Sequence, residues 1–159
     1  MNIQGIDHIT IGVRDLTRAM QFFSRLLDTQ FIELTGPMAD ASPMRCAMSV
    51  ENRIELVEPK IPLPEDAFPL IKRLASVLEY NDAVLFAVAF RVKNAEVTIK
   101  EAEKQGVHIE TKFDIPDFSV WGSINVKELL TIDEDTLGVN MKFIEHTQIL
   151  RSNQPCTQI

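Results

Sequence analysis

A strand followed by a helix occurs twice in this chain, and this repeat constrains the fold more than any other feature. The first copy covers residues 6–16, where apolar and polar residues alternate before a helical pattern begins. The second copy covers residues 85–95. The copies differ at one position, because His8 in the first corresponds to Ala87 in the second. The repeat predicts two similar folding units, of which only the first keeps an imidazole at this position.

Each unit is predicted to have the order β-α-β-β-β. Asp15 and Asn94 are suited to cap the two helices, and Gly106 occupies a usual helix stop position. The predicted strands cover residues 6–13, 31–35, 44–50 and 53–57 in the first unit, and 83–92, 107–112, 124–132 and 139–144 in the second. We therefore expect the α+β class, with two tandem βαβββ modules.

Module boundaries follow from changes in composition. Residues 1–58 are expected to form the first module and residues 83–146 the second. Residues 59–82 contain several prolines, which do not fit a central strand, and are interpreted as a linker with a short helix near 71–78. Residues 147–159 are polar and lack periodicity, which indicates a loose tail.

Composition excludes several classes of function. The chain has 159 residues, 45% of them hydrophobic, and a net charge of −7 without a basic stripe, which argues against nucleic-acid binding. No apolar run is long enough to cross a membrane and no signal segment is visible, so we expect a cytoplasmic protein. Cys46 and Cys156 lie far apart in the chain and are expected to stay reduced.

Three segments resemble the vicinal oxygen chelate superfamily, which includes glyoxalase I, bleomycin resistance proteins, extradiol dioxygenases and methylmalonyl-CoA epimerase. They are residues 6–9 with 13–16, residues 53–59 and residues 133–139, and they look most like the epimerase branch. The resemblance covers nearly the whole chain. It implies an open, curled mixed sheet that forms a cleft, with helices on the convex side, commonly in a homodimer.

The resemblance also implies four positions that usually bind a divalent metal ion. They fall on His8, Glu55, Ala87 and Lys142. Only His8 and Glu55 can bind a cation, and an ammonium at Lys142 would repel a divalent ion or pair with Glu55. The cofactor is therefore expected to be either absent or a divalent ion in an incomplete site.

Further candidates lie near the expected cleft. Arg45 is near the place where epimerase-like members have a catalytic acid, so it would offer an anion-binding group instead, or it is a surface residue on an edge strand. The expected substrate pocket contains Met44, Met48, Phe118 and Trp121, which would otherwise be core residues. Residues 114–122 are interpreted as a loop that forms either a lid or a contact with a second subunit.

Several functions remain open, and whether the chain is an enzyme is left undecided. We favour a protein that binds or acts on a small, partly apolar, anionic molecule without the full metal site. If it is catalytic, isomerase or lyase chemistry on an enolate would use Lys142 and Arg45 for charge, and His8 or Glu55 to move the proton. The alternatives are a metal-dependent enzyme of the epimerase, glyoxalase or dioxygenase type that uses His8 and Glu55, and a drug-sequestering binding protein.

Overall fold

The chain forms one mixed sheet flanked by helices. The computed structural model describes residues 1–118 and 124–148. Its eight strands have the order β2-β3-β4-β1-β5-β8-β7-β6 and are β1 Ile3–Val13, β2 Ile32–Glu33, β3 Met44–Ser49, β4 Ile54–Pro59, β5 Ala83–Val92, β6 Ile109–Phe118, β7 Ile124–Thr131 and β8 Met141–Gln148. The helices are α1 Leu16–Leu27, α2 Pro37–Ala41, α3 Pro69–Leu78 and α4 Ala95–Lys104, with a short 3-10 helix at Glu134–Thr136.

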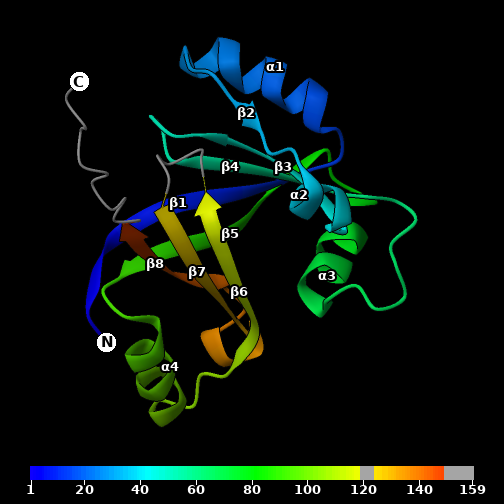
Figure 1. Ribbon diagram of the computed structural model, residues 1–159. Coiled ribbons are helices and arrows are strands. Elements are labelled where there is room, and N and C mark those ends of the chain that lie inside the picture. Colours follow the sequence, from blue (N-terminus) through cyan, green and yellow to red (C-terminus); the bar gives the residue numbers. More distant parts are fainter. Residues whose placement is uncertain (119–123, 149–159) are drawn as a thin grey trace, which may run out of the picture.

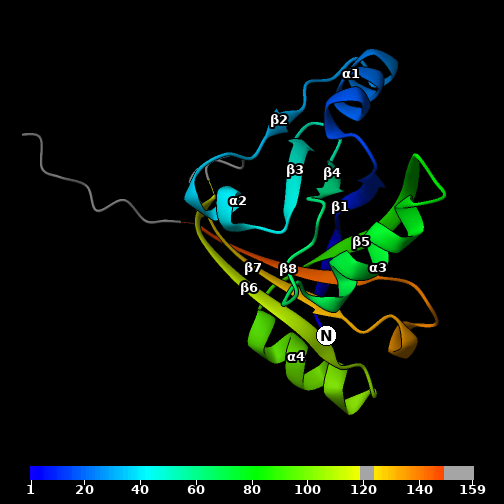
Figure 2. The ribbon, with the colours of Figure 1, turned by 90° about the vertical axis from the view of Figure 1, so that its right-hand side faces the viewer.

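The predicted α+β class with a curled sheet is confirmed. β1 pairs in parallel with β4 and antiparallel with β5, and β5 pairs in parallel with β8. The two halves thus meet along β1 and β5, and the sheet curls so that one of its faces is concave (Figures 1 and 2).

Helices α1 and α4 cover the convex face of the two halves. Asp15 accepts a hydrogen bond from the backbone nitrogen of Arg18 at 2.9 Å, and Asn94 accepts one from that of Val97 at 2.9 Å, so both predicted caps are present. The apolar stripes of both helices pack on alternate residues of the strands behind them. Both helices therefore lie where the sequence places them, on the side away from the cleft.

Helix α3, expected only as part of a linker, packs on the concave face instead (Figure 2). Its residue Leu74 is fully buried and lies against Gly12 of β1 and Val57 of β4. Arg14 donates hydrogen bonds to the carbonyl oxygens of Leu78 and Glu79, at 2.9 and 3.1 Å, and so satisfies the C-terminal end of the helix. The helix closes one end of the cleft.

The contact between Gly12 and Leu74 gives a testable prediction. A Cβ at Gly12 would collide with the Leu74 side chain, so Gly12→Ala is expected to lower the free energy of unfolding by about 1–3 kcal/mol. Leu74→Ala should cost about 2–5 kcal/mol because it leaves a cavity. In the Leu74→Ala background the cost of Gly12→Ala should largely disappear, which urea denaturation can measure. Additive costs in the double variant would contradict this packing.

Other segments differ from their predictions. β6 continues through Phe118 and pairs with β7, so residues 114–118 are not a loop, because their backbone groups join the ladder. β8 continues to Gln148, two residues into the predicted tail. Trp121, the rest of the proposed lid, Cys156 and residues 149–159 lie outside the described residues. Within the described part, Cys46 is free and buried, and every helix is too short or too polar to span a membrane.

Candidate functional site

The strand register relates the four positions that the family resemblance implies as metal ligands, and it places them on the concave face of the sheet. Thr10 of β1 lies opposite Glu55 of β4, and Ala89 of β5 lies opposite Lys142 of β8. His8 also pairs with Ala89, and Thr10 with Ala87, across the junction of the two halves. Under the approximate twofold relation of the halves, Glu55 corresponds to Lys142 and His8 to Ala87. These are the pairs that the resemblance implies.

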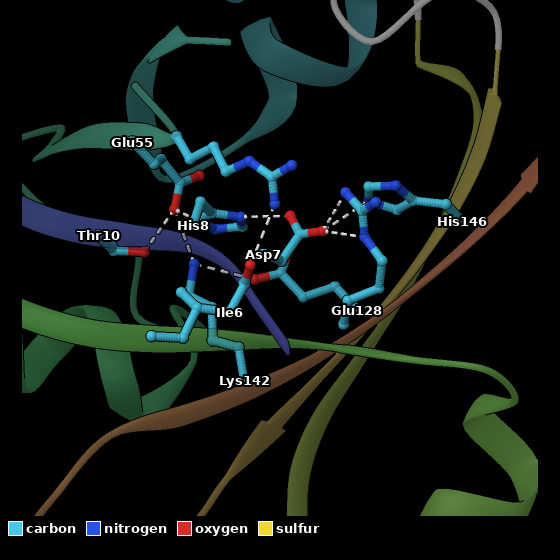
Figure 3. A network of polar contacts seen from close by, with 10 residues as sticks. Ile6, Asp7, His8, Thr10, Glu55, Glu128, Lys142 and His146 are labelled. Atoms are coloured by element: carbon cyan, nitrogen blue, oxygen red, sulfur yellow. Dashed lines mark hydrogen bonds and ion pairs between the residues drawn. The ribbon is translucent and has the colours of Figure 1, made fainter. Parts of the chain in front are cut away.

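The Lys142 ammonium is held between two carboxylates. Its Nζ donates to Glu55 Oε2 at 2.8 Å and lies 2.9 Å from Glu128 Oε1 (Figure 3). Thr10 Oγ1 donates to the same Glu55 oxygen at 2.7 Å. The side chains of Lys142, Glu55 and Glu128 are only 8%, 11% and 15% exposed, so their charges are shielded from water. A fixed, buried cation thus stands where the other half has a carboxylate.

His8 links this group to a second one. Its Nε2 lies 3.5 Å from Glu55 Oε2, and its Nδ1 lies 2.9 Å from Asp7 Oδ1. The other Asp7 oxygen accepts hydrogen bonds from Arg91 Nε at 2.8 Å and lies 3.3 Å from His146 Nε2 (Figure 3). The concave face therefore carries one continuous polar chain of alternating charge.

The network fixes the charge states of its members. Burial alone would raise the pKa of Glu55, but Lys142 and His8 outweigh it and hold that pKa well below the usual value. Burial would likewise lower the pKa of Lys142, whereas Glu128 and Glu55 raise it above its ordinary range. For His8, the hydrogen bonds to Asp7 and Glu55 overcome burial and raise the pKa to about 9. At neutral pH all three groups are charged.

The raised pKa of His8 predicts how stability depends on pH. The folded pKa of about 9 exceeds the ordinary histidine value of 6.5. The stabilisation is therefore complete below about pH 6.5 and is lost as the pH rises through about 9, which amounts to about 3 kcal/mol. Asp7 and Glu55 favour the charged imidazole, while Lys142 opposes it. The free energy of unfolding of the wild type and of His8→Gln can be measured by urea denaturation between about pH 6 and pH 10, a range that includes both pKa values. The difference between the two proteins should shrink as the pH rises. Parallel profiles for the two proteins would contradict a charged His8.

The donor set does not fit a divalent metal ion. Ala87 supplies no ligand, and the Lys142 ammonium already contacts the carboxylate of Glu55, so a second cation at that carboxylate would meet a positive charge at close range. Among the described residues, no group of three or more His, Cys, Asp or Glu side chains is arranged to hold a metal.

A mostly apolar pocket of about 30 Å³ lies beside Lys142, with room for one small group of a ligand rather than for a whole molecule. Thr10, Glu55, Glu128 and Lys142 form its polar wall. Its apolar wall includes Met44, Val57, Phe68, Phe86, Phe113 and Leu130, of which Phe68 and Phe113 meet edge to face at 5.6 Å.

The predicted pocket residues are divided by the structure. Met44 lines the pocket, and Met48 is buried opposite Glu55 in the register. Phe118 packs against a separate apolar cluster of the second half, which includes Val126 and Ile144. These three residues therefore do not share one pocket.

Arg45, interpreted from the sequence as an anion-binding group or as a surface residue, is not brought to the network. It pairs with Glu58 across β3 and β4, whereas the network uses the face of Glu55, and alternate residues of a strand point to opposite faces. Its guanidinium contacts Glu33 at 2.9 Å and Glu58 at 2.8 Å. Two carboxylates already neutralise this arginine on the convex side.

Five members of the network were not predicted from the sequence: Asp7, Thr10, Arg91, Glu128 and His146. His146 was interpreted as a surface residue, but the alternation of β8 gives a signal for it. It lies four residues after Lys142 on the same strand and therefore on the same face of the sheet. Asp7 gives no such signal, because it sits at a register shift between Ile6 and His8.

Comparison with known proteins agrees with this architecture. A family model described as the Glyoxalase/Bleomycin resistance protein/Dioxygenase superfamily matches residues 7–117. The chain belongs to this superfamily. The suspected membership in the vicinal oxygen chelate group is thus confirmed. A search of curated proteins found no significant match.

Solved members of similar fold include methylmalonyl-CoA epimerases. The enzyme from Mycobacterium tuberculosis is 20% identical, with a TM-score of 0.66 over 90% of this chain and 88% of that one. A variant of the Streptomyces coelicolor epimerase in complex with 2-nitronate-propionyl-CoA is 18% identical, with a TM-score of 0.67 over 91% and 98%. A hypothetical protein from Bacillus halodurans is 21% identical, with a TM-score of 0.65 over 92% and 97%. At these identities the likeness establishes the fold of the superfamily alone.

Proposed function

We propose that this superfamily member binds a small, partly apolar molecule without a divalent metal ion, and that one group of this molecule enters the pocket beside Lys142. The observation that carries the proposal is the contact of the Lys142 ammonium with Glu55 and Glu128, at 2.8 and 2.9 Å. This internal cation takes over the neutralisation of the carboxylate that a metal would otherwise provide. An ammonium has three donors, and two of them are used here, so one remains for an oxygen of the ligand.

The ligand group beside Lys142 is expected to be an uncharged oxygen, such as a carbonyl. Glu55 and Glu128 balance the charges of Lys142 and of the protonated His8, so these four groups have no net charge. They offer an anionic group no net attraction, whereas a carbonyl oxygen can accept the third hydrogen bond of the ammonium. The apolar wall supplies most of the contact area, as is usual for small-molecule sites.

Binding fits the charge states better than proton abstraction does. A general base works best with a pKa near the working pH, and Glu55 is held ionised as a weak base. His8 has a pKa of about 9 and carries its proton at neutral pH, so it is a donor rather than an acceptor. Isomerase or lyase chemistry is the second candidate, because Lys142 and His8 place positive charge where an enolate oxygen would form.

The test is a thermal-shift screen of small carbonyl compounds, followed by calorimetry. Met44→Trp fills the pocket and is expected to abolish binding, whereas Met38→Trp, on the exposed side of α2, is the matched control and should bind normally. Equal binding by both variants would refute the pocket. Incorporation of solvent deuterium into a bound ligand would favour the enzymatic candidate.

We also propose the homodimer that the family resemblance implies. Helix α1 exposes Phe22, Leu26 and Leu27, with 53%, 63% and 39% of their surfaces accessible, and such a patch suits a second copy of the chain. Light scattering after gel filtration would measure the assembly state.

A further inference from the structure

A second pocket lies at the end of the polar chain away from Lys142. It is lined by Asp7, Val50, Arg53, Arg91 and His146. We propose that this pocket binds the carboxylate or phosphate group of a small anionic molecule, with Arg53 and Arg91 as its cations. The proposal concerns a separate site and does not rest on the apolar pocket described above.

The position of Arg91 in the sheet explains why this end is open. Gly12 lies opposite Val57 in the parallel pairing of the first half, and Arg91 lies opposite Ile144 in that of the second, so Arg91 corresponds to Gly12. Leu74 of α3 packs on Gly12 and closes that end of the cleft. At the corresponding place in the second half, β5 carries Arg91, whose side chain is 36% exposed. One end of the concave face is thus filled by a helix and the other presents a cation.

Asp7 orients Arg91 without neutralising the pocket. Both Nε and Nη2 of Arg91 lie 2.8 Å from Asp7 Oδ2, which leaves the other edge of the planar guanidinium for a ligand. Asp7 directs its remaining oxygen to His8 (Figure 3). Two guanidinium groups and one carboxylate give the lining a charge of +1. Burial lowers the pKa of His146, so at neutral pH its ring adds hydrogen-bonding capacity rather than charge.

The backbone of Arg53 supports a functional role for its side chain. Its φ angle of 53° lies in the left-handed region, which is unfavourable for a residue of this size. Arg53 Nη1 donates to the carbonyl oxygen of Ile6 at 3.2 Å, so the side chain is folded across β1 next to Asp7. A glycine would adopt this turn without strain, and strain of this kind is concentrated at functional sites.

The site can be tested with inorganic phosphate and with malonate, as separate probes of phosphate and carboxylate recognition. Each is titrated into the whole protein at constant ionic strength set with chloride, and amide chemical shifts are followed by NMR. We expect saturable shifts centred on residues 5–8, 50–53 and 144–148. Arg53→Gln, which keeps the same backbone demand, should weaken binding about tenfold or more. The preference between the two probes identifies the group that the pocket recognises.

Arg18→Gln is the matched control, because it removes the same charge from an exposed position on α1. It should bind both probes as the wild type does, and so should Met44→Trp, which alters only the apolar pocket. Equal weakening by Arg53→Gln and Arg18→Gln would show a general charge effect and overturn the proposal. So would shifts that rise linearly without saturation in the wild type.

Discussion

Replacement of Lys142 by methionine is expected to lower the free energy of unfolding by about 3–5 kcal/mol, because it removes the cation that contacts both the buried Glu55 carboxylate and the mostly buried Glu128 carboxylate. Methionine has nearly the same length, so the loss comes from charge rather than from volume. Glu55 and Glu128 would then repel one another, and Glu55 would keep only part of its stabilisation, from His8 and from the Thr10 hydroxyl. Urea denaturation at pH 7 and at a pH of about 5 would measure the effect, which should shrink at the lower pH as carboxylates take up protons.

The control for this prediction removes the two carboxylates as well. The triple variant Lys142→Met, Glu55→Gln, Glu128→Gln should recover most of the lost stability, since no uncompensated charge remains. Glu145→Gln, a change of a carboxylate outside the network on the same strand, should not rescue Lys142→Met. A loss below about 1 kcal/mol in the single variant would show that the ammonium is solvated rather than held in a buried pair.

If the proposal of a metal-free site is right, substitution of Lys142 by glutamate is expected to create a metal site. It places a carboxylate at the position related to Glu55 and removes the repelling ammonium, so that His8, Glu55, Glu128 and the new side chain can supply mixed imidazole and carboxylate ligands. Calorimetry with Mn(II), Co(II) and Ni(II) should show affinity on the order of 100-fold above that of the wild type. The metal should also raise the stability of the variant, by about 2.7 kcal/mol at a concentration 100 times the Kd.

Two further variants separate this prediction from non-specific binding. Ala87→His with Lys142→Glu should bind more tightly than Lys142→Glu alone, because it fills the fourth family position. Lys142→Gln removes the ammonium without adding a ligand and should bind metal only weakly. A stoichiometric, Glu55-dependent metal in the wild type would refute the metal-free proposal and return the chain to the metal-dependent enzymes of its superfamily.

The candidate site could be predicted in part from sequence because the chain is duplicated. Comparison of the two halves aligned Glu55 with Lys142 and gave their pairing as one of two alternatives, and the register and the 2.8 Å contact agree with it. The same reasoning left two interpretations of Arg45, an anion-binding group and a surface residue, since its place near a family position did not reveal which face of β3 it occupies. Glu128 was missed because its partner lies on a neighbouring strand that only the folded sheet identifies.

The sequence by itself determined the local structure: alternation and helical spacing specify the strands and helices, Asp15 and Asn94 start α1 and α4, and the repeat specifies two similar halves. These signals act over a few residues and can therefore be read along the chain. Tertiary structure alone decided that α3 enters the cleft and that Asp7 joins His8 to Arg91. The second of these depends on a register shift in β1 and on a contact between residues 84 positions apart. Such contacts form only when the strands pair, because pairing determines which side chains share a face and which charges are buried together.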